Sequence, residues 1–226
     1  MVIKIEILST LKYFEGLSDN ELEPIQKYMV EKSVSKGEVF VVEDERSEYL
    51  YFLIEGMVKV YKSLNNGKEQ ILHIAPPGEA LNDTAAYDGG LNIGSMMALT
   101  PVTLYGLPKK YLISILEKNS KMFLNVLKAL AYRTRRDANL VKELSFAQVM
   151  ERLAKLILGE YAGEKSSVGL WLTQQDMANM IGTRREVVNR SLKIMEEKGA
   201  IKLARHRVII VNKRILEEMS SPDTVL

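Results

Sequence analysis

Residues 172–201 constrain the fold most, because they encode two short helices that meet at a glycine. Thr173 with Asp176, and Thr183 with Glu186, have the spacing of a capping box, in which a hydroxyl caps a backbone N–H and a carboxylate reaches back. Gly182 lies between the two helix starts and permits a sharp turn. A shared inward face at helical spacing is formed by Met177, Ala178, Ile181, Val188, Leu192 and Met195. The segment therefore predicts a helix-turn-helix.

The opposite face of the second predicted helix is polar. Residues three or four apart lie on one side of a helix, so four side chains are expected to cluster there: Arg185, Glu186, Asn189 and Arg190. Arginine can pair with two acceptors of guanine, and glutamate can accept a hydrogen bond from cytosine N4. We therefore predict that these four side chains read DNA bases.

Positive charge is concentrated in the same region. Residues 183–214 contain ten Lys/Arg and three Asp/Glu, a net charge of +7, whereas the whole chain carries +2. Such local basicity is typical of a surface that binds the DNA backbone. The predicted backbone contacts are Thr173, Thr183, Arg184, Lys193, Lys202, Arg205 and Arg207.

Two short apolar runs follow, Ile201–Leu203 and Arg207–Asn212, and they predict a β-hairpin. A hairpin at this place indicates a winged helix-turn-helix. Two alternatives are an ordinary helical hairpin with a solvated charged face, and a module whose winged helix contacts protein rather than DNA. The concentration of positive charge favours DNA.

Upstream of residue 108 the pattern is typical of strands. Four apolar runs, at residues 39–42, 49–54, 57–61 and 70–74, predict strands, and Asn65-Asn66-Gly67 is a hairpin signal between the last two. We expect an antiparallel β unit over residues 30–107. A short helix at residues 18–30 should precede it, because Ser18 and Glu21 form another capping box.

A helical region is expected from about residue 108, broken near residues 119–120, with a long helix over residues 121–143. A narrow apolar seam like that of a coiled coil is formed by Phe123, Leu127, Leu130, Thr134 and Val141. Helix-turn-helix modules commonly read two half-sites with two-fold symmetry, so we predict a homodimer joined along this seam. Packing of the seam within its own domain is the alternative. Ser145 is expected to cap a further helix at residues 146–161.

Composition excludes several classes of protein. The chain has no cysteine, so disulfides and thiolate-bound iron–sulfur clusters are excluded. No apolar run approaches the ~20 residues that span a bilayer, and the first residues lack the layout of a signal peptide, so we expect a cytoplasmic protein without membrane contact. No motif of a hydrolase, nucleotide-binding enzyme or zinc protease is present, and we expect neither catalysis nor a metal site.

The order of these parts resembles the Crp/Fnr superfamily of bacterial transcription regulators over essentially the whole chain. Residues 50–61, 77–90 and 183–190 carry the resemblance. It implies an α+β fold with an effector-sensing β-roll, like the cyclic-nucleotide-binding jelly roll, at residues 1–118. A dimerisation helix at 119–144 and a winged helix-turn-helix DNA-binding domain at 145–226 would follow. In the family's recognition helix an Arg-Glu-(three residues)-Arg pattern reads T-G-x-G-A-like half-sites, and Arg185, Glu186 and Arg190 match it.

The sensor region departs from the family pattern. Cyclic-nucleotide-binding members hold the ribose with a Gly-Glu pair and the cyclic phosphate with Arg-Ser-Ala, whereas the corresponding positions here are Asn82-Asp83 and a part of residues 92–95 without arginine. A phosphate anion needs positive charge, so binding of cAMP in the usual manner is not expected. A Thr-Ser pair of the long helix is replaced by Asp137-Ala138. The candidate effector residues are Asn82, Asp83, Thr84, Asn92, Ser95 and Asp137.

Three alternatives to cAMP stay open at this point. One is a different small effector in the same pocket, and another is haem, as in gas-sensing members of the family, with His73, Met96 or Met97 as an axial ligand. The third is no ligand at all. The expected partners are double-stranded DNA with a two-fold symmetric operator, a second copy of the chain, and RNA polymerase.

Overall fold

The protein is described here by a computed structural model, which covers residues 3–161, 172–204 and 207–221. The chain divides into two compact units, residues 1–131 and 132–226. This division falls inside one long helix, α5 (Ser120–Phe146). The three-part division expected from the sequence, with boundaries after residues 118 and 144, stays a prediction.

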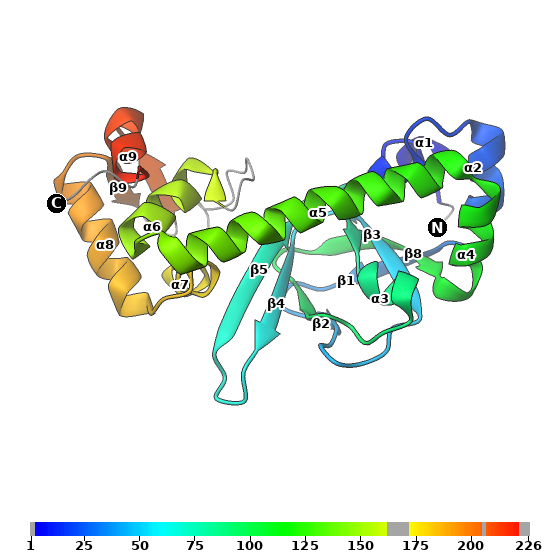
Figure 1. Cartoon of the computed structure of the whole chain (residues 1–226), viewed down its shortest axis with the longest axis horizontal. Coiled ribbons are helices and arrows are strands. Elements are labelled where there is room, and N and C mark those ends of the chain that lie inside the picture. The colour runs from blue at the N-terminus through cyan, green and yellow to red at the C-terminus, as the bar shows by residue number, and fades with distance from the viewer. Residues whose placement is uncertain (1–2, 162–171, 205–206, 222–226) are drawn as a thin grey trace. The chain divides into compact units, whose positions relative to one another are not determined.

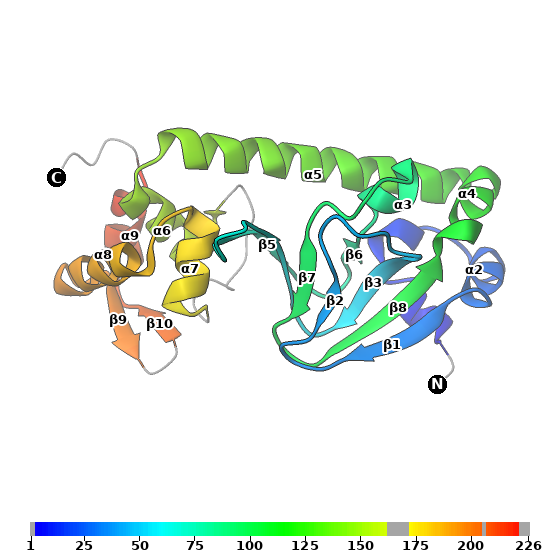
Figure 2. The ribbon, with the colours of Figure 1, turned by 90° about the horizontal axis from the view of Figure 1, so that it is seen from below.

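The first unit contains two four-stranded antiparallel sheets, which Figure 2 shows facing each other. The first sheet has the order β1 (Val30–Val34), β8 (Val102–Pro108), β3 (Tyr49–Glu55) and β6 (Ala80–Leu81). The second has the order β2 (Val39–Val41), β7 (Ser95–Ala98), β4 (Val58–Ser63) and β5 (Glu69–Ala75). The predicted antiparallel β-roll is confirmed.

A hydrophobic core fills the space between the two sheets. Alternate residues of a strand share one face, so Leu53, Val60, Met96 and Leu104 meet in a single buried cluster. The predicted hairpin at residues 65–67 joins β4 to β5, and Gly67 takes the left-handed conformation that the turn requires, with φ of 77°.

Helices cover the other face of the first sheet. They are α1 (Ile5–Leu8), a 3-10 turn at Lys12–Phe14, α2 (Asp19–Gln26), α4 (Lys109–Lys118) and the first half of α5, which gather together in Figure 1. Phe14, Leu50, Phe52 and Leu107 belong to the second buried cluster that joins these helices to the sheet. The predicted capping box of α2 is confirmed, because Ser18 N donates to Glu21 Oε2 at 2.8 Å.

The long helix is confirmed, as is the break before it, since α4 ends at Lys118 and α5 begins at Ser120. The predicted helix start at Ser145 is wrong. Ser145 still belongs to α5, and the next helix, α6 (Val149–Leu158), begins after Gln148. Ala147 N donates to Glu143 O at 3.2 Å, which carries the helical bonding past the serine and leaves it no helix start to cap.

The second unit is a winged helix-turn-helix, as predicted. After the second half of α5 it comprises α6, α7 (Gln174–Ile181), α8 (Arg185–Glu197), β9 (Ile201–Ala204), β10 (Arg207–Ile210) and α9 (Lys213–Met219). All six residues of the predicted inward face are at most 1% exposed. The sequence reasoning missed α9, which Asn212 caps by accepting from Ile215 N at 3.3 Å. Among the described residues, no helix combines the length and the apolar character needed to cross a membrane.

Candidate nucleic-acid interface and effector region

The turn between α7 and α8 is built by local backbone chemistry. Thr173 caps α7, with its Oγ1 accepting from Asp176 N at 3.1 Å and donating to Asp176 Oδ2 at 2.5 Å, which confirms the predicted hydroxyl cap at this helix start. Gly182 ends α7 in the left-handed conformation, with φ of 66°, and Thr183 N then donates to Ala178 O at 3.0 Å. The second predicted capping box is wrong: Arg184 is the N-cap of α8, and no side chain caps it. Thr183 completes the end of α7, so α8 starts one residue later than the spacing suggested.

The predicted base-reading side chains share the outer face of α8. Arg185, Glu186, Asn189 and Arg190 are all exposed, while Val188 on the inner face is completely buried. None of these four exposed side chains has a hydrogen bond or ion pair with another residue in the described part of the chain. Their donors and acceptors therefore remain available to a ligand, on a helix that the core beneath holds in place.

The wing is fixed to α8 by a hydrogen bond. Glu196 Oε1, near the end of α8, accepts from Leu203 N at 2.7 Å. Lys202 and Arg207 are exposed on β9 and β10, in positions that suit the predicted backbone contacts. The remaining predicted contacts are exposed or, for Thr183, partly exposed: Thr173, Thr183, Arg184 and Lys193. Arg205 lies outside the described residues.

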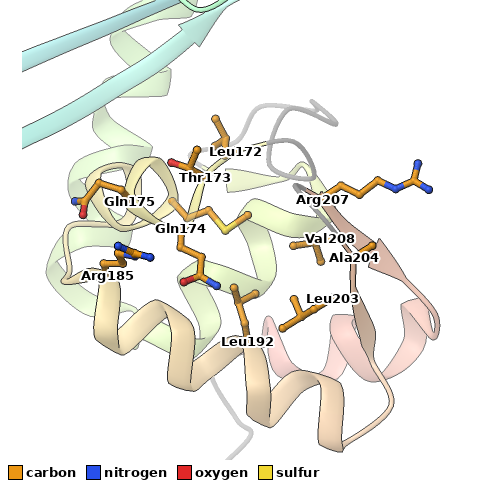
Figure 3. Close-up of a pocket in the computed structure, with 11 residues that line it drawn as sticks. Leu172, Thr173, Gln174, Gln175, Arg185, Leu192, Leu203, Ala204, Arg207 and Val208 are labelled. Carbon is orange, nitrogen blue, oxygen red and sulfur yellow. The ribbon is translucent and has the colours of Figure 1, made fainter.

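A groove of about 400 Å³ separates the start of α7 from α8 and the wing. Its floor is apolar, and Figure 3 shows Leu192 and Leu203 facing each other there. Thr173, Gln174 and Arg185 contribute polar groups, whereas the Arg207 side chain extends away from the groove. The groove thus brings together predicted base-reading and backbone-contacting residues from three elements.

The predicted effector residues of the β-roll lie in and around the segment between β6 and β7, which includes α3 (Thr84–Asp88). Asp83 is 1% exposed, and its Oδ2 accepts from Tyr13 Oη at 2.5 Å. Burial and the Asp83 carboxyl raise the pKa of Tyr13 far above its ordinary value, so the hydroxyl stays a donor. Asp83 therefore connects the end of β6, at the edge of the first sheet, to the 3-10 turn that contains Tyr13.

The other polar residues of this segment also make internal hydrogen bonds. Asn82 donates to Tyr49 O at 3.4 Å, and Asn92 donates through Nδ2 to Val42 O at 2.8 Å. Ser95 Oγ accepts from Glu43 N at 3.0 Å. Thr84 is half-buried at the start of α3.

This segment does not fit the phosphate of a cyclic nucleotide. Residues 82–95 contain no lysine, arginine or histidine, and the positions 92–95, where the family pattern would place arginine, include the buried Asn92 and the exposed Ile93. Gly94 packs so closely that an added Cβ would lie 2.8 Å from Tyr61 O. Asp137 lies in the second unit, where its Oδ1 is 3.2 Å from Arg136 Nη2. Lys109 of α4 reaches this segment from outside, but its Nζ donates to Ala85 O at 3.1 Å. No residue within 82–95 itself offers a cation to a buried phosphate charge.

The histidine considered as a haem ligand is already engaged. His73 is 7% exposed, and its Nε2 lies 2.7 Å from Glu79 Oε1, whereas its buried Nδ1 has no hydrogen-bond partner among the described residues. Met96 belongs to the core between the sheets. These contacts favour a structural role for both residues over axial ligation.

The predicted dimer seam of α5 is mostly exposed. Phe123, Leu127 and Val141 are 50%, 47% and 63% exposed, and Thr134 is also exposed. Leu130 is half-buried and packs against the cluster of the N-terminal helices. Large apolar side chains repeated along one helix face are a typical association surface.

Comparisons with known proteins agree with this architecture. One family model, described as a cyclic nucleotide-binding domain, matches residues 31–119, and another, described as a Crp-like helix-turn-helix domain, matches residues 151–219. The chain is 28% identical over 211 residues to a CRP-like cAMP-activated global transcriptional regulator of Mycobacterium tuberculosis, covering 91% of this chain and 94% of that protein. It is 24% identical over 208 residues to the cyclic AMP receptor protein of Thermus thermophilus, covering 92% and 95%. The solved structure of FixK2 from Bradyrhizobium japonicum is similar with a TM-score of 0.73 and 20% identity, over 87% of this chain and 99% of that one.

Proposed function

Because the chain belongs to the Crp/Fnr family of DNA-binding transcriptional regulators, we propose that it acts as a homodimer whose two α8 helices read a two-fold symmetric operator. The observation that carries this proposal is the outer face of α8, where the exposed side chains of Arg185, Glu186, Asn189 and Arg190 have no partner among the described residues. Members of this family are transcriptional regulators and not enzymes.

The chemistry of that face suits the DNA major groove. Arg185 and Arg190 each present a guanidinium fork that matches the O6 and N7 acceptors of guanine, and Glu186 between them can accept from cytosine N4. Asn189 can pair with adenine. The exposed Lys202 and Arg207 of the wing would contact phosphates, which fix orientation without reading sequence.

The homodimer would form along α5. A solvent-exposed row of Phe123, Leu127 and Val141 has the heptad-like spacing of a two-helix interface. A dimer of this kind presents two recognition helices to half-sites one helical turn apart, about 34–36 Å.

We expect any effector to bind without an ion pair between a phosphate group and an arginine. Relatives of this chain are named as cAMP-activated, yet residues 82–95 carry no cation, and the polar side chains of Asp83, Asn92 and Ser95 make internal bonds. We expect cAMP to leave the melting temperature of the purified protein unchanged within about 1 °C at millimolar concentration. A rise of several degrees would overturn this part of the proposal.

The base-reading role is tested by Arg185→Ala in fluorescence anisotropy with labelled operator and scrambled DNA. We expect a loss of about 1–3 kcal/mol on the operator, a relaxed preference at the contacted base pair, and little change on scrambled DNA. The matched control is Arg214→Ala, since Arg214 is an exposed arginine of α9 that pairs with Glu218 at 3.2 Å. Equal losses on both DNAs, or equal effects of both variants, would contradict base reading.

A further inference from the structure

A cluster of ionised groups joins α6 to the C-terminal end of α5. Lys155 Nζ of α6 donates to both carboxyl oxygens of Glu143, at 2.9 and 3.1 Å, and to Glu151 Oε1 at 2.7 Å. The three side chains are only 22%, 14% and 10% exposed. Pairs that are shielded from water to this degree interact more strongly than surface ion pairs.

Arg152 makes a second connection at the same place. Its Nη1 donates to Ala147 O at 2.5 Å and approaches Glu143 O at 3.4 Å, and the residue is 8% exposed. Ala147 O lies just past the end of α5, where carbonyl groups lack helical partners and the helix carries partial negative charge, whereas Glu143 O already accepts from Ala147 N at 3.2 Å. The guanidinium thus satisfies and neutralises the helix end.

The helix α6 otherwise belongs to the DNA-binding module. Its main packing partners in the described part of the chain are α9 and α7, with α8 next. Only Ala147 and Gln148 separate α5 from α6, and Phe146, beside this junction, is 84% exposed. At this junction Lys155 and Arg152 therefore link α6 to the end of α5 by polar contacts.

We propose that Lys155 and Arg152 are positioning residues for operator recognition, which lock the α5–α6 junction and so fix the separation of the two α8 helices in the dimer. The inference rests on the proposed homodimer and adds the groups that set its half-site spacing. If α5 joins the protomers, any rotation at the junction moves each recognition helix relative to the two-fold axis. An operator with fixed spacing can then be bound only when the junction holds one angle.

Lys155 is the central group of this lock. Removing its charge leaves Glu143 and Glu151 facing each other without a cation, so that repulsion opens the junction. Burial alone would lower the pKa of Lys155, but its hydrogen bonds to Glu151 and Glu143 raise the pKa above its ordinary value. The ammonium is therefore charged under physiological conditions.

The direct test measures the distance between the two recognition helices. The chain has no cysteine, so Glu197→Cys, at the exposed end of α8, introduces a single site for a spin label. Pulsed electron paramagnetic resonance of the full-length dimer should give one narrow distribution of the distance between the two spin labels. Lys155→Met should broaden this distribution at least twofold. Lys155→Arg should restore the narrow distribution, because it retains the charge. An unchanged width in Lys155→Met, with a folded circular dichroism spectrum, would overturn the inference.

A second measurement uses operators whose half-sites are separated by zero to four additional base pairs. The parent protein should prefer one spacing by at least tenfold, and Lys155→Met should reduce that preference to about threefold or less while leaving binding to an isolated half-site within twofold. An equal loss on the half-site and on all operators would indicate general damage and would contradict a positioning role. Absence of any distance between labels in the parent protein, or of any DNA binding by it, would instead refute the proposed homodimeric regulator.

Discussion

Removing the hydrogen bond between Tyr13 and Asp83 distinguishes most clearly between a structural and a ligand-binding role for the segment between β6 and β7. Tyr13 is 3% exposed and Asp83 is 1% exposed, and they are joined by a bond of 2.5 Å. Tyr13→Phe keeps the ring, which packs edge-on against Phe52 at 5.5 Å, and removes only the hydroxyl. The substitution therefore removes the interactions of the hydroxyl with Asp83 and with Tyr87 and leaves the ring in place.

The expected cost follows from the charge and burial of the acceptor. A hydrogen bond to a charged group contributes about 1.5–3 kcal/mol to stability, and a buried acceptor that loses its donor also keeps its desolvation penalty. We expect Tyr13→Phe to lower the free energy of unfolding by about 2 kcal/mol. For a chain of this length the melting temperature should fall by roughly 4–8 °C.

Urea unfolding followed by circular dichroism measures this cost, in a double-mutant cycle with Asp83→Ala. We expect a coupling energy of about 1.5–3 kcal/mol between the two positions. A coupling below about 0.5 kcal/mol would contradict a structural role for Asp83, because a carboxyl group directed at an effector would be energetically independent of Tyr13.

Three further predictions concern the DNA-binding module and the dimer. The double variant Lys202→Ala, Arg207→Ala should weaken binding to all DNA sequences, and the slope of log K against log salt should become shallower by about 2. A loss of affinity for only some sequences would contradict contact with phosphates. Leu127→Glu should convert the dimer to a monomer in sedimentation experiments without unfolding it, since this side chain is 47% exposed, and a dimer of unchanged affinity would exclude the α5 seam. Because the pKa of Lys155 is raised in the folded protein, its contribution to the free energy of unfolding is fully present below pH 10.5 and is lost as the pH rises through that raised pKa. Lys155→Met should therefore abolish this loss of stability at alkaline pH. An equal loss of stability at alkaline pH in the parent protein and in Lys155→Met would show that another group is responsible.

The helix-turn-helix was predictable because its determinants are local. The apolar spacing of Val188, Leu192 and Met195 fixes the inward face, and Gly182 supplies the left-handed turn. The error at Thr183 arose because the same residue can end one helix or start the next. In the structure Thr183 N donates to Ala178 O, so this residue belongs to the end of α7. The spacing of capping residues does not predict which of the two helices takes such a residue.

The partners of the buried polar residues could not be predicted. Tyr13 and Asp83 are 70 positions apart, and no local pattern in the sequence links them. Glu143 and Lys155 likewise meet only because α5 continues past Ser145 and turns at Ala147, which the sequence analysis placed differently. Long-range contacts of this kind depend on the packing of whole elements, whereas capping and periodicity report only on single elements.

The most direct test of the central claim is a titration of the full-length protein against a two-fold symmetric operator built from T-G-x-G-A-like half-sites, with scrambled DNA as the competitor. At physiological salt we expect two protomers per operator and a preference over scrambled DNA of at least about 10³-fold, the lower range for specific DNA-binding proteins. Binding of one protomer, or equal affinity for both DNAs, would contradict a dimeric reader whose α8 helices recognise bases.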